Sequence, residues 1–380
     1  MRIAVEVPYY ALGARGSTQY GENLVRALGA ASPQDRFYAF NYFYGDHARR
    51  RDDLAARLAA DNVELALPRW PQSWVDRLER AGYPFVERRF LRPRGIDVFH
   101  NAGAHPIKTP NVITVHGVPW YDPPGRLRFE QAILPRLAQA SAVIAVSRCI
   151  RDYLLRFYPI AESRCALIHY GVDHQVFRPI SDAKSLDQAR RRHGLPERFL
   201  LCVGPFQLRD NIEALLYVLR RRRDHRLLRG LKLALLGGSL EEHGHALKRR
   251  VAQLGLEDMV VWVGYVPHDQ LAAVYNLAQL YVHPSFYEEL GAQLLEASAC
   301  GRPILAARGG GIEEAVGDGA LYFDATRLDE LEAALLRALE SVPLRDELGG
   351  RALEWSRRFD WGLCARRHLE LYRAAAARAG

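Results

Sequence analysis

The run Ser285-Phe-Tyr-Glu288-Glu-Leu-Gly291-Ala-Gln-Leu-Leu-Glu296-Ala-Ser-Ala-Cys-Gly301 contains two carboxylates, Glu288 and Glu296, with seven residues between them. An apolar segment that ends at Pro284 precedes the run, and a second short apolar segment, 303–307, follows it. Between the two carboxylates leucines recur at helical spacing, and a glycine closes the pattern. The sequence therefore predicts strand, loop, helix and strand, with Glu288 in the loop and Glu296 two turns into the helix.

Two carboxylates placed in this way can hold the two ends of an elongated polar ligand. In an open α/β sheet, the loop after a strand lies at the carboxyl end of the sheet, where ligands bind. The helix N-terminus behind the loop favours an anion. Eight helical residues span ~12 Å at 1.5 Å each, so Glu288 and Glu296 suit the sugar and the ribose of a nucleotide-sugar. The alternative is a pair of surface glutamates on an amphipathic helix.

The length and composition indicate a globular protein of two domains. A chain of 380 residues is too long for one ordinary core, and its content of 49% hydrophobic and 25% charged residues is ordinary for a globular protein. We expect no membrane-spanning helix, because no apolar window approaches 18 residues. The first residues, 1–7, are expected to form a strand rather than a signal peptide. Five scattered cysteines without C-x-x-C favour a reducing cytosol and argue against a zinc site.

The net charge of +8 comes mostly from arginine. A positive balance suits anionic ligands such as nucleotide diphosphates or acidic lipids. The sequence contains no nucleic-acid-binding motif, so we expect no nucleic-acid partner.

Apolar segments of strand length alternate with helical segments along the first half of the chain. This alternation predicts a parallel, doubly wound sheet. The expected strands are 2–7, 37–40, 63–67, 97–100, 112–115 and 143–146.

The connection after the first strand is rich in small residues. We expect a loop over 8–20 and a helix from about Glu22, with Gly16 and Ser17 at the junction. Small residues there let backbone N–H groups approach a phosphate. The run is not G-x-G-x-x-G, which argues against a dinucleotide site, and a merely flexible connection is the alternative.

Three histidines of the first half are candidates for a ligand site. His116 ends the strand 112–115, where a side chain reaches the carboxyl edge of the sheet. A lone histidine after a strand is more often structural than catalytic. His100 and His105 have weaker claims.

Residues 45–95 are rich in arginine with aromatic residues interleaved, including Trp70 and Trp74. A solvated, arginine-rich helical face is one interpretation. The other is an interfacial patch that contacts anionic lipid through arginine and tryptophan.

Several motifs share one resemblance. The pattern Pro-Ser-x-Tyr-Glu-x-x-Gly-x-x-x-Leu-Glu-Ala-x-Ala-Cys-Gly-x-Pro-Ile over 284–304 resembles the signature of family 4 of the retaining, GT-B-type glycosyltransferases. The linker 166–179, the strand and turn 260–266 and the glycine loop 308–319 are similar to further motifs of that family, in the same order. The resemblance covers residues 2 to about 373.

The resemblance implies a GT-B fold, with two doubly wound Rossmann-like domains that face each other across a cleft. Residues 1–178 would form the acceptor-side domain, 179–358 the nucleotide-sugar domain, and 359–380 a helix that packs back on the first domain. It implies metal-independent, retaining transfer to a hydroxyl of a sugar or lipid-linked sugar, in cell-surface polysaccharide or glycolipid synthesis. The nucleotide-diphosphate sugar is then a substrate, with no cofactor. Independently of the resemblance, the scattered cysteines favour a cytoplasmic location, and the interfacial interpretation of residues 45–95 would give peripheral contact with the inner face of the membrane.

The resemblance also implies roles for individual residues. Arg209 would hold the leaving diphosphate, Glu288 the hydroxyls of the donor sugar and Glu296 the ribose, while His116 would lie beside the transferred sugar. The remaining residues expected to contact the nucleotide-sugar are Gly16, Ser17, Asp210, Val266, Leu290, Gly291 and Ala292.

Three positions depart from the family pattern. Asp210 stands where the family usually has a lysine, Glu289-Leu290 replaces Gly-Phe, and Gly16-Ser17 replaces a glycine pair. Charge on a leaving group must be stabilised by preorganised donors, so Asp210 and Glu289 motivate an alternative, a catalytically impaired homologue that binds a sugar nucleotide or a partner. A second alternative, an epimerase of GT-B type that needs no acceptor, has only the shared architecture in its favour.

Overall fold

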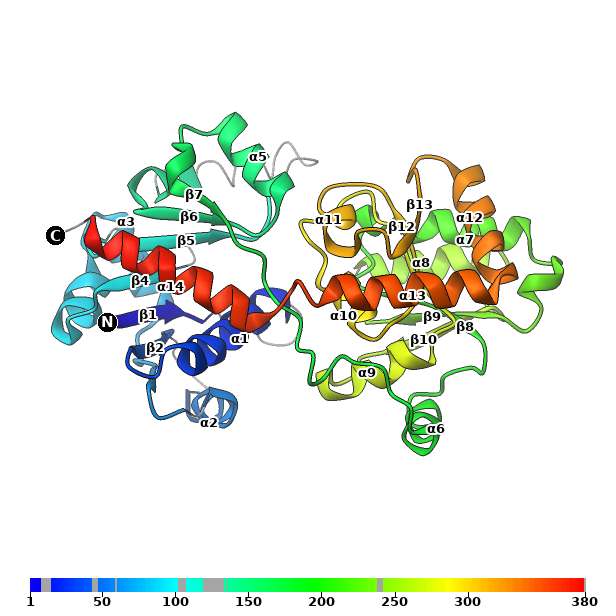
Figure 1. The fold of residues 1–380 in the computed structure, drawn as a ribbon, viewed down its shortest axis with the longest axis horizontal. Helices are drawn as coiled ribbons and strands as arrows, with labels where there is room; N and C mark the ends of the chain where they lie inside the picture. Colours follow the sequence, from blue (N-terminus) through cyan, green and yellow to red (C-terminus); the bar gives the residue numbers. More distant parts are fainter. Residues whose placement is uncertain are drawn as a thin grey trace. The chain divides into compact units, whose positions relative to one another are not determined.

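The computed structural model describes residues 1–7, 15–42, 47–58, 60–101, 107–118, 133–134, 136–237 and 242–378. The chain divides into two compact units (Figure 1). Unit 1 comprises Met1–Gly171 together with Asp360–Gly380, and unit 2 comprises Val172–Phe359. The sequence analysis placed the domain boundaries at residues 178 and 358.

Among its described residues, unit 1 holds a seven-stranded sheet in the order β3-β2-β1-β4-β5-β6-β7, and all neighbours are parallel. Strands β4, β5 and β6 are buried along their whole length, as expected for a parallel sheet covered on both faces. The strands are β1 (Arg2–Glu6), β2 (Arg36–Phe40), β3 (Val63–Ala66), β4 (Val98–Asn101), β5 (Asn111–Val115), β6 (Ala142–Ala145) and β7 (Cys165–Leu167).

The helices of unit 1 come from both ends of the chain. Helix α14 (Trp361–Ala377), red in Figure 1, packs against α1 (Arg15–Ala31) and against strands β4 and β5. Its buried residues, among them Leu369 and Tyr372, join the core formed by β1 and α1. Unit 1 also contains α2 (His47–Leu58), α3 (Gln72–Arg80), a π-helical turn (Glu87–Leu91), α5 (Arg148–Phe157) and two 3₁₀ turns (Arg92–Arg94 and Glu162–Arg164).

Helix α1 begins at Arg15, so the prediction of a loop up to residue 20 and a helix from about Glu22 was wrong. The reason is the apolar face of the helix. Tyr20, Leu24 and Leu28 are all buried and lie one turn apart, so the stripe that faces the sheet already includes Tyr20.

The described part of unit 2 holds a six-stranded parallel sheet in the order β10-β9-β8-β11-β12-β13. Its strands are β8 (Phe199–Val203), β9 (Lys232–Leu236), β10 (Val260–Gly264), β11 (Leu280–His283), β12 (Ile304–Ala307) and β13 (Ala320–Phe323). Its helices are α6 (Ala183–Arg192), α7 (Ile212–Arg221), α8 (Glu242–Gln253), α9 (His268–Leu277), α10 (Ala292–Ala299), α11 (Ile312–Val316), α12 (Leu328–Glu340) and α13 (Val342–Ser356), with 3₁₀ turns at Leu208–Asp210 and Arg226–Leu228.

Each sheet has a point where its strand order reverses. In unit 2 the chain passes from β8 to β9 and β10 on one side, and then crosses to β11 on the other side. In unit 1 strand β1 has β2 on one side and β4 on the other. Ligands of open α/β sheets bind outside the carboxyl ends of the strands at such points. The doubly wound α/β architecture predicted from the sequence is confirmed in both units.

Candidate active site

Two loops meet at the reversal point of the unit 2 sheet, one after β8 and one after β11. The N–H of Phe286 and the hydroxyl of Ser285 both donate to the carbonyl oxygen of Arg209, at 2.9 and 3.1 Å. The side-chain amide of Asn211 donates to the carbonyl of Pro284 at 3.2 Å. These bonds fix the backbone that carries Arg209 against the backbone that leads to Glu288.

The glycine loop after β12 packs on the same backbone. The N–H of Gly311 donates to the carbonyl of Glu288 at 2.7 Å. A Cβ atom on Gly310 would lie 2.2 Å from that carbonyl oxygen, and one on Gly309 would lie 2.4 Å from the carbonyl oxygen of Phe286. Because no real side chain fits there, the glycines allow the backbones of the three strand-end loops to pack directly against one another.

The side chain of Arg209 lies between two carboxylates. Its Nη1 is 3.3 Å from Oε1 of Glu289, and its Nε is 3.8 Å from Oδ1 of Asp210. Burial raises the pKa of Glu289, and the neighbouring Glu288 raises it further, while Arg209 opposes the shift. The cation expected to hold a diphosphate is therefore partly neutralised by groups of its own chain.

Asp210 closes the turn Leu208–Asp210. Its Oδ2 accepts the N–H of Gln207 at 2.8 Å, and its own N–H donates to the carbonyl of Gln207 at 3.0 Å. Burial raises the pKa of Asp210, while the bond from Gln207 acts in the opposite direction. A lysine, which the family usually has here, could not accept this bond.

The loop carboxylate Glu288 faces a histidine that the sequence analysis did not select. Nε2 of His283 lies 3.5 Å from Oε1 of Glu288; His283 is buried and Glu288 is partly buried. Nδ1 of His283 lies 3.2 Å from the hydroxyl of Tyr281, which is two residues earlier on the same face of β11. His283 is the last residue of β11, so the strand-end reasoning applied to His116 would also have found it.

The helix carboxylate Glu296 is held by a tyrosine from the neighbouring helix. The hydroxyl of Tyr275 on α9 donates to Oε2 of Glu296 at 2.7 Å. Burial raises the pKa of Tyr275 well above its usual value, and the negative charge of Glu296 raises it further. The tyrosine thus remains a donor, and it fixes the orientation of the carboxylate.

The remaining unit 2 candidates would contact a ligand through main-chain atoms. Gly291 has φ 85° and precedes Ala292, the first residue of α10. Leu290 and Val266 are fully buried, the first in the β11–α10 loop and the second just after β10. Their side chains therefore serve the core, so a ligand would meet their backbone.

The unit 1 candidate His116 follows β5 at the carboxyl edge of its sheet and is partly buried. Its ring meets the ring of Tyr20 edge-on, with centroids 4.4 Å apart and planes at 80°. Burial lowers the pKa of His116 to about 4, so the ring is neutral at pH 7. Gly16 and Ser17 lie in the first turn of α1, and their side chains fall outside the described residues.

The two weaker histidine candidates have different outcomes. His100 is buried on β4, with Nε2 2.8 Å from the Thr114 hydroxyl and Nδ1 2.6 Å from the Tyr372 hydroxyl. His105 lies outside the described residues.

Within the described ranges, no group of three or more His, Cys, Asp or Glu side chains is arranged to hold a metal ion. No helix in that part of the chain is long and apolar enough to cross a membrane.

The arginine-rich segment 45–95 has one strongly exposed tryptophan. Trp74 on α3 is 68% exposed, and Leu78 one turn later and Tyr83 are also exposed. Trp70, in contrast, packs edge-on against Phe85 at 4.8 Å between ring centroids. Of the two tryptophans in the predicted interfacial patch, only Trp74 is strongly exposed, and membrane contact stays a prediction.

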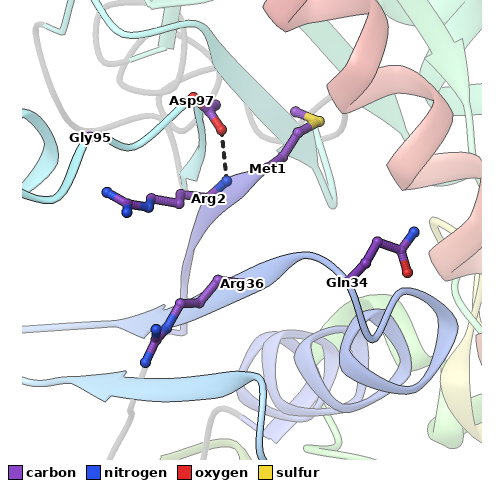
Figure 2. Close-up of a pocket in the computed structure, with 6 residues that line it drawn as sticks. All are labelled: Met1, Arg2, Gln34, Arg36, Gly95 and Asp97. Atoms are coloured by element: carbon purple, nitrogen blue, oxygen red, sulfur yellow. Dashed lines mark hydrogen bonds between the residues drawn. The ribbon is translucent and has the colours of Figure 1, made fainter.

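A pocket in unit 1 lies at the edge of its sheet opposite the carboxyl ends of the strands. Figure 2 shows it at the amino-terminal ends of β1 and β2, where the N–H of Arg2 donates to Asp97 Oδ2 at 2.7 Å. The edge opposite the strand carboxyl ends is not where open α/β sheets bind ligands. Its lining residues are Met1, Arg2, Gln34, Arg36, Gly95 and Asp97.

Comparison with known proteins adds two family matches. The family of glycosyl transferases group 1 matches residues 185–355, and glycosyltransferase family 4 matches residues 15–176. The first match includes Arg209, Glu288 and Glu296, and the second includes His116.

Individual relatives agree with these matches. A D-inositol 3-phosphate glycosyltransferase of Frankia alni is 34% identical over 263 residues, which are 67% of this chain and 63% of the relative. The match thus spans less than two thirds of that relative's length. O-antigen chain mannosyltransferase B of Escherichia coli is 26% identical over 307 residues, 80% of this chain and 77% of the relative.

A solved structure shows the same fold. The Anabaena protein HepE, determined in complex with UDP and glucose, superimposes with a TM-score of 0.74 and 18% identity over 97% of this chain and 98% of its own. The two doubly wound sheets, the ordered motifs and these similarities lead to one assignment. The chain belongs to family 4 of the GT-B-type glycosyltransferases.

Proposed function

We propose that this chain transfers a sugar from a nucleotide-diphosphate sugar to a hydroxyl acceptor, with retention of configuration and without a metal ion. The observation that carries the proposal is the placement of Arg209, Glu288 and Glu296 on the segments that follow β8 and β11, the two strands at the reversal point of the unit 2 sheet. One cation and two oriented carboxylates on adjoining elements match the diphosphate, the sugar hydroxyls and the ribose hydroxyls of such a donor. The match to HepE, solved with UDP and glucose, favours a uridine nucleotide.

Each carboxylate has a distinct role in this scheme. Glu296, oriented by Tyr275, would accept hydrogen bonds from the ribose hydroxyls. Glu288, beside His283, would accept from the hydroxyls of the donor sugar and hold its ring in the reactive orientation. The carboxylate of Glu296 is held by the Tyr275 hydroxyl before the donor arrives, whereas Glu288 is held through its backbone carbonyl, which accepts the N–H of Gly311.

Arg209 would stabilise the charge that develops on the departing diphosphate. Its guanidinium is paired with the carboxylate of Glu289, so the diphosphate would compete with Glu289 for the same cation. Backbone N–H groups at the start of α10, after Gly291, would add further donors.

In this scheme no side chain acts as a general base. The acceptor oxygen bonds to the anomeric carbon as the bond from that carbon to the phosphate oxygen breaks. The proton of the acceptor hydroxyl moves to the departing phosphate on the same face of the sugar, which retains the configuration. His116 contributes a neutral ring beside the transferred sugar, because burial holds its pKa at about 4.

For the acceptor we propose a sugar or lipid-linked sugar in polysaccharide or glycolipid synthesis at the inner face of the cell membrane. The name of the Escherichia coli relative includes the O-antigen chain, a glycoconjugate. The exposed Trp74 and Leu78 on α3, with Arg77 exposed between them, would give peripheral contact with an anionic surface.

The Arg209–Glu289 pair and the buried Asp210 also favour a second candidate, a chain that binds a sugar nucleotide without turning it over. The two candidates differ in turnover, not in binding. A measurement of transfer therefore separates them, whereas a binding measurement alone does not.

The test is a screen of UDP-, GDP- and dTDP-sugars against sugar and lipid-linked acceptors, with release of nucleoside diphosphate as the readout. We expect release that depends on the acceptor and continues in excess EDTA, and a product whose anomeric proton coupling by NMR matches that of the donor. Glu288→Gln should abolish turnover, while Glu347→Gln on the exposed face of α13 is the matched control. Donor binding without turnover in any combination would favour the second candidate.

A further inference from the structure

Unit 1 contains a continuous chain of buried polar side chains that the proposed chemistry does not use. Its members come from four elements: Tyr20 from α1, His100 from β4, Thr114 from β5, and His368 and Tyr372 from α14. All five are buried. Consecutive polar atoms lie within hydrogen-bond distance, at 2.6, 2.8, 3.2 and 2.9 Å in the order Tyr372, His100, Thr114, Tyr20, His368.

The direction of every hydrogen bond in this chain follows from its last acceptor. Nδ1 of His368 lies 2.8 Å from the carbonyl oxygen of Cys364, which can only accept, so Nδ1 carries the proton. Burial lowers the pKa of His368 to about 4, so its ring is neutral and Nε2 is an acceptor. The hydroxyl of Tyr20 must therefore donate to His368.

The remaining bonds are fixed in turn. The Tyr20 oxygen accepts from the hydroxyl of Thr114, and Thr114 accepts from Nε2–H of His100. Nδ1 of His100 then accepts from the hydroxyl of Tyr372. This single arrangement satisfies every link, and it places the two histidines in opposite tautomers.

The hydrogen-bonded series of side chains reaches the candidate residue His116 through the ring of Tyr20. Thr114 lies on β5, and His116 follows it by two residues, just after the end of the strand. Tyr20 contacts both of them, because its hydroxyl bonds Thr114 and its ring meets the His116 ring edge-on. Any tilt of the tyrosine ring would therefore displace the imidazole of His116.

We propose that Tyr20 is a positioning residue for His116, and that helix α14 holds Tyr20 in place through His368. Helix α14, which is far from His116 in the sequence, thus affects the geometry of His116 through Tyr20. The consequence for activity rests on the proposed function, whereas the consequence for ring geometry does not.

Two variants separate positioning from general stability. Tyr20→Phe and Tyr372→Phe each remove one buried hydroxyl from the same chain, but only Tyr20 contacts His116. We expect similar losses in thermal midpoint for both. Tyr20→Phe should lower kcat by roughly tenfold to a hundredfold with the KM for the donor unchanged, because a small misplacement of an active-site group is costly. Tyr372→Phe should keep the wild-type kcat, and equal kcat values for the two variants would overturn the proposal.

A second readout works without turnover. In protein labelled with ¹⁵N at histidine rings, Tyr20→Phe should shift the ring resonances of His116 and His368, and Tyr372→Phe should shift those of His100. The wild-type ¹⁵N shifts should show His368 protonated at Nδ1 and His100 at Nε2. If no donor and acceptor pair gives product, the proposed function fails, and these spectra still decide the positioning role. Resonances of His116 that Tyr20→Phe leaves unmoved would contradict it. If Tyr20→Phe does not fold, His368→Gln, which replaces the partner of the Tyr20 hydroxyl, is measured in the same way.

Discussion

The guanidinium Nη1 of Arg209 lies 3.3 Å from Oε1 of Glu289, so the one arginine of the β8–α7 loop already has an anionic partner. A diphosphate that reaches Arg209 must displace this carboxylate or share the cation with it. Both side chains are about one-fifth exposed, so solvent weakens the pair only in part. We therefore expect the pair to lower the affinity of the site for an anion.

Glu289→Gln should increase the affinity for nucleoside diphosphate. The amide removes the negative charge beside Arg209 while keeping the size of the side chain. We expect a gain of about 1 kcal/mol, which corresponds to roughly fivefold in Kd. Calorimetric titration with UDP and GDP measures it, with Glu347→Gln on the exposed face of α13 as a control. Unchanged or weaker binding would show that Glu289 does not compete with the ligand.

Asp210 can be tested by changing its charge and its acceptor separately. Asp210→Asn keeps an oxygen for the N–H of Gln207 and removes a charge 3.8 Å from Arg209, so we expect tighter diphosphate binding with little loss of stability. Asp210→Lys restores the family charge but removes the acceptor of the turn. Leaving that N–H without a partner costs about 1–3 kcal/mol, so the lysine variant should melt earlier. A lysine variant as stable as the asparagine variant would argue against the turn-closing role.

Glu296→Ala should weaken nucleotide binding by about 1–3 kcal/mol, because the ribose hydroxyls lose a charged acceptor. Tyr275→Phe leaves the carboxylate in place but removes the donor that orients it, so its effect should be smaller. Calorimetry with UDP and with uracil alone separates ribose from base. Wild-type affinity in Glu296→Ala would show that the ribose assignment is wrong.

The buried histidines predict acid sensitivity of unit 1. Burial lowers the pKa of His368 to about 4, below the unfolded value of 6.5. The contribution of the neutral His368 ring to the free energy of unfolding is fully present above pH 6.5. It is lost as the pH falls from 6.5 to 4, because the unfolded chain then binds more protons than the folded chain. Each such histidine contributes a slope of about 1.4 kcal/mol per pH unit in that window. His368→Gln should reduce this pH dependence of the free energy of unfolding by the contribution of one histidine, as measured by denaturant titration at several pH values. An unchanged pH dependence would contradict the buried neutral ring.

Membrane contact through residues 45–95 predicts flotation with anionic vesicles. Each basic residue near an anionic leaflet contributes about 1 kcal/mol, and salt screens this attraction. Binding should therefore be strongest on anionic vesicles at low salt and should fall at high salt. Trp74→Ala should reduce it, whereas Trp262→Ala, a change of a partly exposed tryptophan in unit 2, should not. Equal, negligible flotation under all conditions would favour an acceptor free in solution.

The sequence predicts those parts of the fold that depend on local patterns. Apolar runs at 37–40, 112–115 and 143–146 became β2, β5 and β6 because a parallel sheet buries both faces of its strands. Glu288 lies in a strand-end loop and Glu296 in α10, as predicted, because Gly291 and the leucine spacing define that helix. The predicted depth was wrong, because α10 begins at Ala292 and Glu296 is its fifth residue, about one turn into the helix rather than two.

The contacts within the site depend on residues far apart in the sequence, and no local pattern encodes them. Tyr275 meets Glu296 only because α9 packs beside α10. The role of Asp210 in the turn became visible only with the backbone in place, because the substitution alone indicates a change of charge. The start of α1 was misplaced because Gly16 and Ser17 resemble a loop, whereas the buried stripe that includes Tyr20 requires a helix.

The most direct test of the central claim is the electron density of a crystal soaked with UDP-glucose and, separately, with a GDP-sugar. We predict density at the reversal point of the unit 2 sheet, with ribose hydroxyls within hydrogen-bond distance of Glu296. The diphosphate should lie on the guanidinium of Arg209, with the side chain of Glu289 moved away from its present 3.3 Å contact. Nucleotide density elsewhere on the chain, with the Arg209–Glu289 pair intact, would contradict the assignment of this site.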